Sequence, residues 1–89
     1  MQEAYIIFEG IVQGVGFRYT SCRLASFHKI GGWVRNRLDG KVEMVVQGKK
    51  EEILSFLEDL KDEFKGYIHN YQIDWRSPSQ IFSDFSIRF

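Results

Sequence analysis

The sequence predicts an α+β domain in which an antiparallel sheet carries two helices on one of its faces. Three features lead to this prediction. Runs rich in Ile, Val, Phe and Tyr alternate with two runs whose apolar residues recur at helical spacing. An Asp-Gly pair stands between two strand-like runs, which is typical of a hairpin. The 89 residues, of which 44 % are hydrophobic, suit one core and a single domain over residues 1–89.

The first half of the chain predicts a strand, a helix and a hairpin. The segments are a strand over residues 3–12, a helix over 18–28, and strands over 32–38 and 41–48. Gly14 and Gly16 break the first strand before the helix begins. Asp39 and Gly40 are expected to form a two-residue turn, in which both residues need a positive φ. Apolar residues alternate along the last of these strands, so Val42, Met44 and Val46 share one face.

The second half predicts a helix over residues 49–64 and two further strands, over 67–76 and 82–89. Gly66 ends the helix, and Pro78 lies in the connection between the strands, where a missing N–H is tolerated. The order is therefore βαββαβ with a short extra C-terminal strand. Two βαβ-like halves with both helices on one face of an antiparallel sheet form the ferredoxin-like sandwich, a fold that hosts many functions.

The charge distribution favours a small anion as the partner. The net charge is zero, which argues against a nucleic-acid-binding ferredoxin-like domain, because such a domain needs a basic excess. Residues 18–50, however, contain eight basic and two acidic residues, a local net charge of +6. This local excess is expected to attract an anionic ligand rather than a polymer.

Cysteine and histidine usage indicates neither a disulfide nor a metal site. Cys22 is the single cysteine, and together with His28 and His69 it shows no metal-ligand spacing. A buried thiol and a partly buried, hydrogen-bonded His28 are the expected roles. No signal-peptide pattern opens the sequence and no apolar run is long enough to cross a bilayer, so we expect a cytoplasmic monomer without a membrane or nucleic-acid partner.

The segment GIVQGVGFR, residues 10–18, is the candidate for chemistry. A glycine-rich turn between a strand and a helix exposes successive backbone N–H groups to an anion, and Arg18 can grip two oxygens of a phosphate. The segment lacks the third glycine of the dinucleotide fingerprint, where Tyr19 stands, and the Gly-Lys-Ser/Thr of a P-loop. From the residues alone, an ordinary tight turn with a surface arginine remains the alternative.

GIVQGVGFR, together with GWVRNRLDGKVE at residues 32–43, resembles the paired signature of the acylphosphatase family. Seventeen residues separate Arg18 from Asn36, as in that family, and the resemblance runs from the first strand to the terminal IRF. It implies hydrolysis of the carboxyl–phosphate anhydride of small acyl phosphates, with no metal or other cofactor and with inorganic phosphate as product and competitive inhibitor.

The resemblance also implies roles for individual residues. The catalytic arginine falls on Arg18 and the catalytic asparagine on Asn36. The phosphate-binding loop falls on residues 13–18, which are Gln13, Gly14, Val15, Gly16, Phe17 and Arg18. Asn36 can hold a water in line with phosphorus but is no strong base. The alternative role for Asn36 is a residue that caps the hairpin. Because one phosphate and its attacking water span less than about 12 Å, the two catalytic side chains are expected to lie within that distance.

The chain departs from the family's pattern at the end of the first helix. Many members have leucine and glycine where this sequence has His28 and Lys29. We therefore expect Lys29 to adopt a left-handed conformation at a cost of about 1 kcal/mol. The alternative to an enzyme is a non-catalytic anion-binding or carbamoyl-phosphate-handling module of the same fold.

Overall fold

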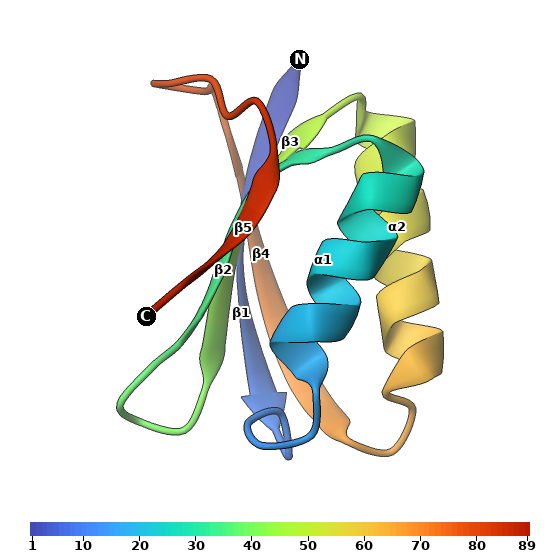
Figure 1. Cartoon of the computed structure of the whole chain (residues 1–89), viewed down its shortest axis with the longest axis vertical. Coiled ribbons are helices and arrows are strands. Elements are labelled where there is room, and N and C mark those ends of the chain that lie inside the picture. Colours follow the sequence, from blue (N-terminus) through green and yellow to red (C-terminus); the bar gives the residue numbers. More distant parts are fainter.

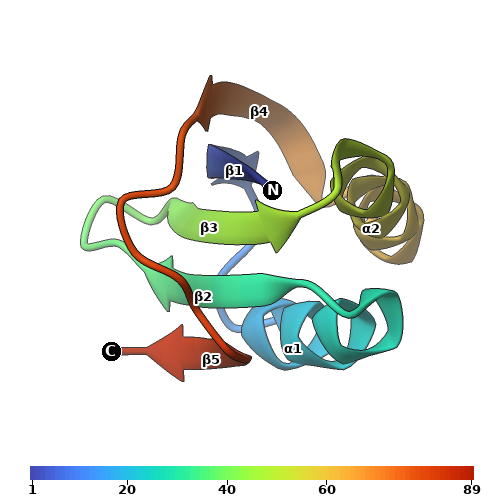
Figure 2. The ribbon, with the colours of Figure 1, turned by 90° about the horizontal axis from the view of Figure 1, so that it is seen from above.

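The structure is a computed structural model that describes all 89 residues, and Figure 1 shows the order β1–α1–β2–β3–α2–β4–β5. The strands are β1 (Gln2–Gly10), β2 (Gly31–Asn36), β3 (Val42–Gly48), β4 (Ile68–Arg76) and β5 (Phe85–Arg88), and the helices are α1 (Phe17–His28) and α2 (Lys50–Glu63). Both helices cover the same face of the sheet (Figure 2). The predicted ferredoxin-like order and the extra C-terminal strand are confirmed. None of the helices combines the length and the apolar character needed to span a membrane.

The five strands lie in the order β4-β1-β3-β2-β5. β1 pairs with β3 and β4, and β2 pairs with β3, all in antiparallel fashion. β5 differs because it pairs with β2 in parallel fashion. β5 and β4 form the two edges of the sheet. The predicted antiparallel sheet therefore has four strands, and the extra strand extends it in the parallel sense. β1 and β2, whose ends carry the candidate residues, are separated by β3.

The connection between β4 and β5 must cross from one edge of the sheet to the other (Figure 2). The buried Gln47 on β3 holds this connection with both atoms of its amide. Its Oε1 accepts a hydrogen bond from the Phe82 N–H at 3.0 Å, and its Nε2 donates to the Gln80 carbonyl at 2.6 Å. One side chain thus fixes the path that leads β5 to its place beside β2.

The core lies between the helices and the sheet. Val42, Met44 and Val46 face it together, as their alternation predicts, and all three are fully buried. α2 contributes Ile53, Phe56, Leu57 and Leu60 to the same cluster of 17 buried residues. Burial of these side chains is the main stabilising contribution, at roughly 1.5 to 3 kcal/mol for each large apolar side chain.

The hairpin between β2 and β3 differs from the prediction. β2 ends at Asn36 and β3 begins at Val42, so the connection spans residues 37–41. Gly40 has a positive φ of 89°, whereas Asp39 does not, and the Gly40 N–H donates to the Arg37 carbonyl at 3.3 Å. The two-residue turn is therefore wrong. The physical reason is that the Asp39 carboxylate accepts a hydrogen bond from the Lys41 N–H at 3.1 Å, which favours a longer turn that closes on a left-handed glycine.

α1 ends in the left-handed conformation predicted for Lys29. The residue has φ 57° and ψ 41° and is the only residue other than glycine with a positive φ. Its N–H donates to the Ser26 carbonyl at 3.2 Å, and the Ile30 N–H donates to the Ala25 carbonyl at 3.1 Å. This pair of bonds is the Schellman motif, whose left-handed position usually carries glycine.

Candidate functional site

The loop between β1 and α1 and the hairpin between β2 and β3 lie at the same end of the molecule (Figure 1). β1 ends at Gly10, two residues earlier than predicted, and a Cβ at this position would lie 2.2 Å from the Tyr67 carbonyl oxygen, so the close approach requires glycine. Gly14 and Gly16 then adopt positive φ of 76° and 81°. A Cβ built at either glycine meets nothing within 4 Å, so the outer side of the loop is open.

Two apolar side chains of the predicted phosphate loop anchor it to the core. Phe17 is 1 % exposed, and its ring lies 5.0 Å from that of Phe8 and 4.9 Å from that of Phe64. Val15 packs against the same core cluster. These side chains are therefore turned inward, which leaves the backbone N–H groups of the loop and the Arg18 side chain to contact a ligand.

The backbone N–H groups of residues 13–19 donate no hydrogen bond within the protein. The bonds of α1 begin with the Thr20 N–H, which donates to the Gly16 carbonyl at 3.0 Å. The backbone N–H groups that donate to side chains belong to Lys41, Lys49 and Phe82, all outside this loop. A continuous row of donors at a loop and a helix N-terminus can receive the oxygens of an anion.

Arg18 is the second residue of α1 and is partly buried. Its guanidinium lies over the ring of Phe89, 5.3 Å from the ring centroid, and it forms no ion pair with a carboxylate. By contrast, Arg35, Arg37 and Lys41 each pair with an acidic side chain. Arg18 therefore retains a positive charge without an acidic partner beside the row of free N–H donors.

Asn36 is the last residue of β2, and its Oδ1 is buried without a hydrogen-bond partner. A buried acceptor left in this state costs about 1 to 3 kcal/mol, so this oxygen is suited to accept a hydrogen bond from a water or a ligand. Asn36 and Phe89 line one groove of about 760 Å³ together with Tyr5, Arg35, Arg37, Leu38, Asp39 and Glu43. Phe89 thus links the two predicted catalytic residues, since it contacts Arg18 and shares the groove with Asn36. Phe89 carries no local sequence signal from which this position could be predicted.

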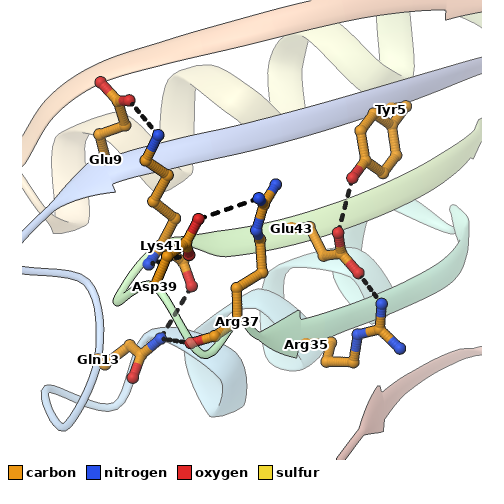
Figure 3. A network of polar contacts seen from close by, with 8 residues as sticks. All are labelled: Tyr5, Glu9, Gln13, Arg35, Arg37, Asp39, Lys41 and Glu43. Atoms are coloured by element: carbon orange, nitrogen blue, oxygen red, sulfur yellow. Dashed lines mark hydrogen bonds and ion pairs between the residues drawn. The ribbon is translucent and has the colours of Figure 1, made fainter.

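Gln13 is the first residue of the predicted phosphate-binding loop, but its side chain is directed away from that loop. Its Nε2 donates to the Arg37 and Lys41 carbonyls, each at 2.8 Å, and so reaches the hairpin (Figure 3). Glu9 at the end of β1 and Lys41 form a second contact between the same two segments, at 2.8 Å (Figure 3).

A polar network lines the wall of the groove (Figure 3). The Tyr5 hydroxyl donates to Glu43 Oε2 at 2.6 Å, and Arg35 donates to the other carboxylate oxygen of Glu43. Burial, followed by the contact with Glu43, raises the pKa of Tyr5. Burial alone would raise the pKa of Glu43, but its hydrogen bonds with Tyr5 and Arg35 outweigh it and lower that pKa. Glu43 is therefore an ionised, structural carboxylate rather than a proton donor.

Cys22 and His28 are not among the residues that line the groove. A cleft of about 690 Å³ that includes Cys22 and Lys29 is lined by neither Arg18 nor Asn36. Burial raises the pKa of Cys22, which suits a half-buried, unreactive thiol more than a nucleophile. The His28 Nε2 lies 2.7 Å from Asp59 Oδ2, so the expected hydrogen-bonded histidine is confirmed. No three His, Cys, Asp or Glu side chains are grouped so as to hold a metal ion.

The chain is similar in sequence and in fold to known proteins of one family. The acylphosphatase family model matches residues 4–87. Acylphosphatase from Bacillus velezensis is 44 % identical over 61 residues, which cover 68 % of each chain. The crystal structure of acylphosphatase from Bacillus subtilis superposes with a TM-score of 0.92 at 35 % identity, over 100 % of both chains. The crystal structure of HypF from T. kodakarensis is similar over 100 % of this chain and 12 % of the HypF chain, at 33 % identity and a TM-score of 0.84.

Proposed function

Because the chain belongs to the acylphosphatase family, and is therefore a hydrolase of the carboxyl–phosphate anhydride bond, we propose that Arg18 binds the phosphoryl group and that Asn36 positions the attacking water. The loop of residues 13–18 surrounds the phosphoryl oxygens with its backbone N–H groups. The substrate is a small acyl phosphate, and no metal ion takes part in the reaction.

The row of unpaired N–H groups beside an unpaired arginine is the observation that carries this proposal. Each N–H at residues 13–19 needs an acceptor, and the oxygens of a phosphoryl group supply several. The guanidinium of Arg18 adds a planar pair of donors and a full positive charge. The site thus combines many donors with one cation, which suits a dianion.

Asn36 supports the second half of the proposal. Its Oδ1 is a buried acceptor without a partner, and Asn36 lines a groove that is open to solvent. A water that donates to this oxygen keeps a lone pair directed at phosphorus. As an amide, Asn36 orients the water and does not take up its proton.

The chemistry needs little more than this. The water oxygen forms a bond to phosphorus while the bond from phosphorus to the acyl oxygen breaks, and the acyl group leaves as a carboxylate with the bonding electrons. The water proton passes to the departing phosphate or to solvent. Phosphoryl transfer through a loose transition state depends on positioning and charge stabilisation, and a carboxylate is a good leaving group. A strong general base is therefore not required.

Three further properties belong to the proposal. Inorganic phosphate occupies the loop as a competitive inhibitor, since it presents the same oxygens as the substrate. Residues 1–89 act as one domain, which is supported by a single core cluster, and the protein acts as a monomer. The protein works in the cytoplasm, for which the one unpaired Cys22 is suited.

The test is hydrolysis of an aryl acyl phosphate in excess chelator by the wild-type protein, Arg18→Lys and Asn36→Ala. We expect wild-type turnover to persist in chelator. Asn36→Ala should lower kcat by about 10² to 10³ with little change in phosphate inhibition, because it acts mainly in the transition state. Arg18→Lys should lose both turnover and phosphate inhibition, since a point charge cannot replace the planar pair of donors.

The likeness to a small part of HypF shows that this fold also occurs within a longer chain, and a non-catalytic anion-binding module is the second candidate. A folded wild-type protein that binds phosphate but does not turn over the acyl phosphate would favour that module. Normal kcat in a stable Asn36→Ala protein would refute the water-positioning role and leave Asn36 as a residue that caps the hairpin.

A further inference from the structure

We propose that the side chain of Gln13 is a positioning element that sets the distance between the phosphate-binding loop and Asn36. The inference rests on the roles proposed above for Arg18 and Asn36. It concerns the side chain alone, since the Gln13 backbone N–H remains one of the unpaired donors of the loop.

The two halves of the proposed site need such a link because they belong to strands that are not neighbours. The loop follows β1 and Asn36 ends β2, with β3 between them in the sheet. Pairing within the sheet therefore fixes each half only through a third strand. The loop also contains Gly14 and Gly16, which give its backbone wide conformational freedom.

The Gln13 amide links the halves directly (Figure 3). Both hydrogens of Nε2 are used, one by the Arg37 carbonyl and one by the Lys41 carbonyl, each at 2.8 Å. The same two carbonyls close the base of the hairpin, because the Arg37 N–H donates to Lys41 at 2.8 Å and the Gly40 N–H donates to Arg37 at 3.3 Å. Arg37 directly follows Asn36, so the link ends one peptide unit from the water-positioning residue.

No other contact between the two segments has the same directional character. The ion pair between Glu9 and Lys41 joins flexible side chains that are both more than a third exposed, and such pairs constrain geometry weakly. The Gln13 amide instead makes two short hydrogen bonds with backbone carbonyls at once. Methionine has nearly the same length and no donor, whereas asparagine keeps the donors on a stem one methylene shorter.

The position of this link predicts which kinetic constant it controls. The N–H donors and Arg18 lie on one continuous segment, which Val15 and Phe17 anchor to the core, so they hold phosphate as a unit. Loss of the link changes the place of this unit relative to Asn36 and not its internal geometry. A misplacement of about 1 Å can cost up to about 100-fold in rate, so kcat should fall while phosphate affinity is kept.

The experiment compares Gln13→Met, Asn36→Ala and the double variant, with Glu9→Gln as the matched control that removes the other contact between the segments. kcat with an aryl acyl phosphate, the inhibition constant of inorganic phosphate and a thermal melt are measured on each. We expect Gln13→Met to lose about 10- to 100-fold in kcat with the inhibition constant within about threefold of wild type. Glu9→Gln should keep kcat within about twofold, since an exposed ion pair contributes little.

The double variant separates positioning from a general structural role. If Gln13 acts through Asn36, then Gln13→Met should cause no further loss of kcat once Asn36 is alanine. Multiplied losses would overturn the proposal, as would phosphate inhibition that weakens in step with kcat. Should Gln13→Met fail to melt cooperatively, Gln13→Asn provides the same comparison with a shorter amide. Normal kcat in Asn36→Ala refutes the proposed function itself, whereas a normal Gln13→Met beside an impaired Asn36→Ala refutes only the positioning role.

Discussion

Replacement of Lys29 by glycine should make the protein more stable without changing its activity. Lys29 is the one residue other than glycine in the left-handed region, and its side chain is exposed and forms no ion pair. Glycine keeps the N–H that donates to the Ser26 carbonyl, so the Schellman motif survives. The substitution therefore removes backbone strain and leaves the hydrogen bonds of the helix end in place.

The expected magnitude follows from two opposing terms. A left-handed conformation costs a residue with a Cβ about 1 to 2 kcal/mol, which glycine avoids. Glycine also makes the unfolded chain more flexible, which costs about 0.4 to 1 kcal/mol. The net gain in the free energy of unfolding is about 0.5 to 1 kcal/mol, and for a domain of this size 1 kcal/mol corresponds to a rise in Tm of about 4 to 8 °C.

The assay is urea denaturation and a thermal melt of the wild type, Lys29→Gly and Lys29→Ala, with acyl phosphate turnover on the same preparations. Lys29→Ala is the matched control, because it removes the charge but keeps the Cβ that causes the strain. It should therefore stay within about 0.5 kcal/mol of wild type, as most exposed substitutions do. A loss of stability in Lys29→Gly would refute the account of the helix end. An equal gain in Lys29→Ala would assign the effect to the lysine charge.

Three other predictions concern the loop, the groove and the crossing connection. Gly16→Ala should lower the free energy of unfolding by about 1 to 2 kcal/mol and weaken phosphate inhibition, because it adds a Cβ on the open side of the loop at positive φ. The control Gly66→Ala, also at positive φ in open space, should lower stability without changing phosphate inhibition. Glu43 has a lowered pKa in the folded state, so its contribution to stability is present above its unfolded pKa near 4.5 and is lost as the pH falls through the folded value. In urea titrations at pH 7 and pH 3, Glu43→Gln should therefore show a smaller drop in the free energy of unfolding between the two pH values than the wild type. Gln47→Met should lower Tm and expose the connection of residues 77–84 to proteolysis, since both amide contacts that hold it are removed, and an unchanged cleavage rate would refute this anchoring role.

Much of the fold follows from local patterns in the sequence. The alternation of Val42, Met44 and Val46 reports which face of β3 is buried, because side chains along a strand point to opposite faces in turn. Both helices and all five strands were predicted from such signals, with ends that differ from the structure by at most three residues. The left-handed Lys29 was predicted because many members of the family have glycine at this position, where glycine serves as the left-handed cap of the helix.

The candidate site also has features that the local sequence indicates and features that depend on the assembled fold. The spacing of Gly14, Gly16 and Arg18 indicates a donor-rich turn at the start of a helix, because backbone conformation depends on neighbouring residues. The sequence could not indicate which of those donors stay unpaired, nor that Arg18 lacks an acidic partner while Arg35 and Arg37 have one. Ion pairing depends on which carboxylates the fold brings within reach, and these come from distant segments as well as from nearby ones.

The sequence by itself thus determined the elements and their buried faces, and it indicated the candidate residues for the chemistry. Only the tertiary structure decided that β5 pairs in parallel with β2, that the hairpin spans five residues, and that the Gln13 amide, 24 and 28 residues away in the chain, meets the hairpin carbonyls. Local preferences act over a few residues and leave a readable pattern. Contacts between distant segments exist only after the sheet has assembled, because it is the order of the strands that brings those segments together.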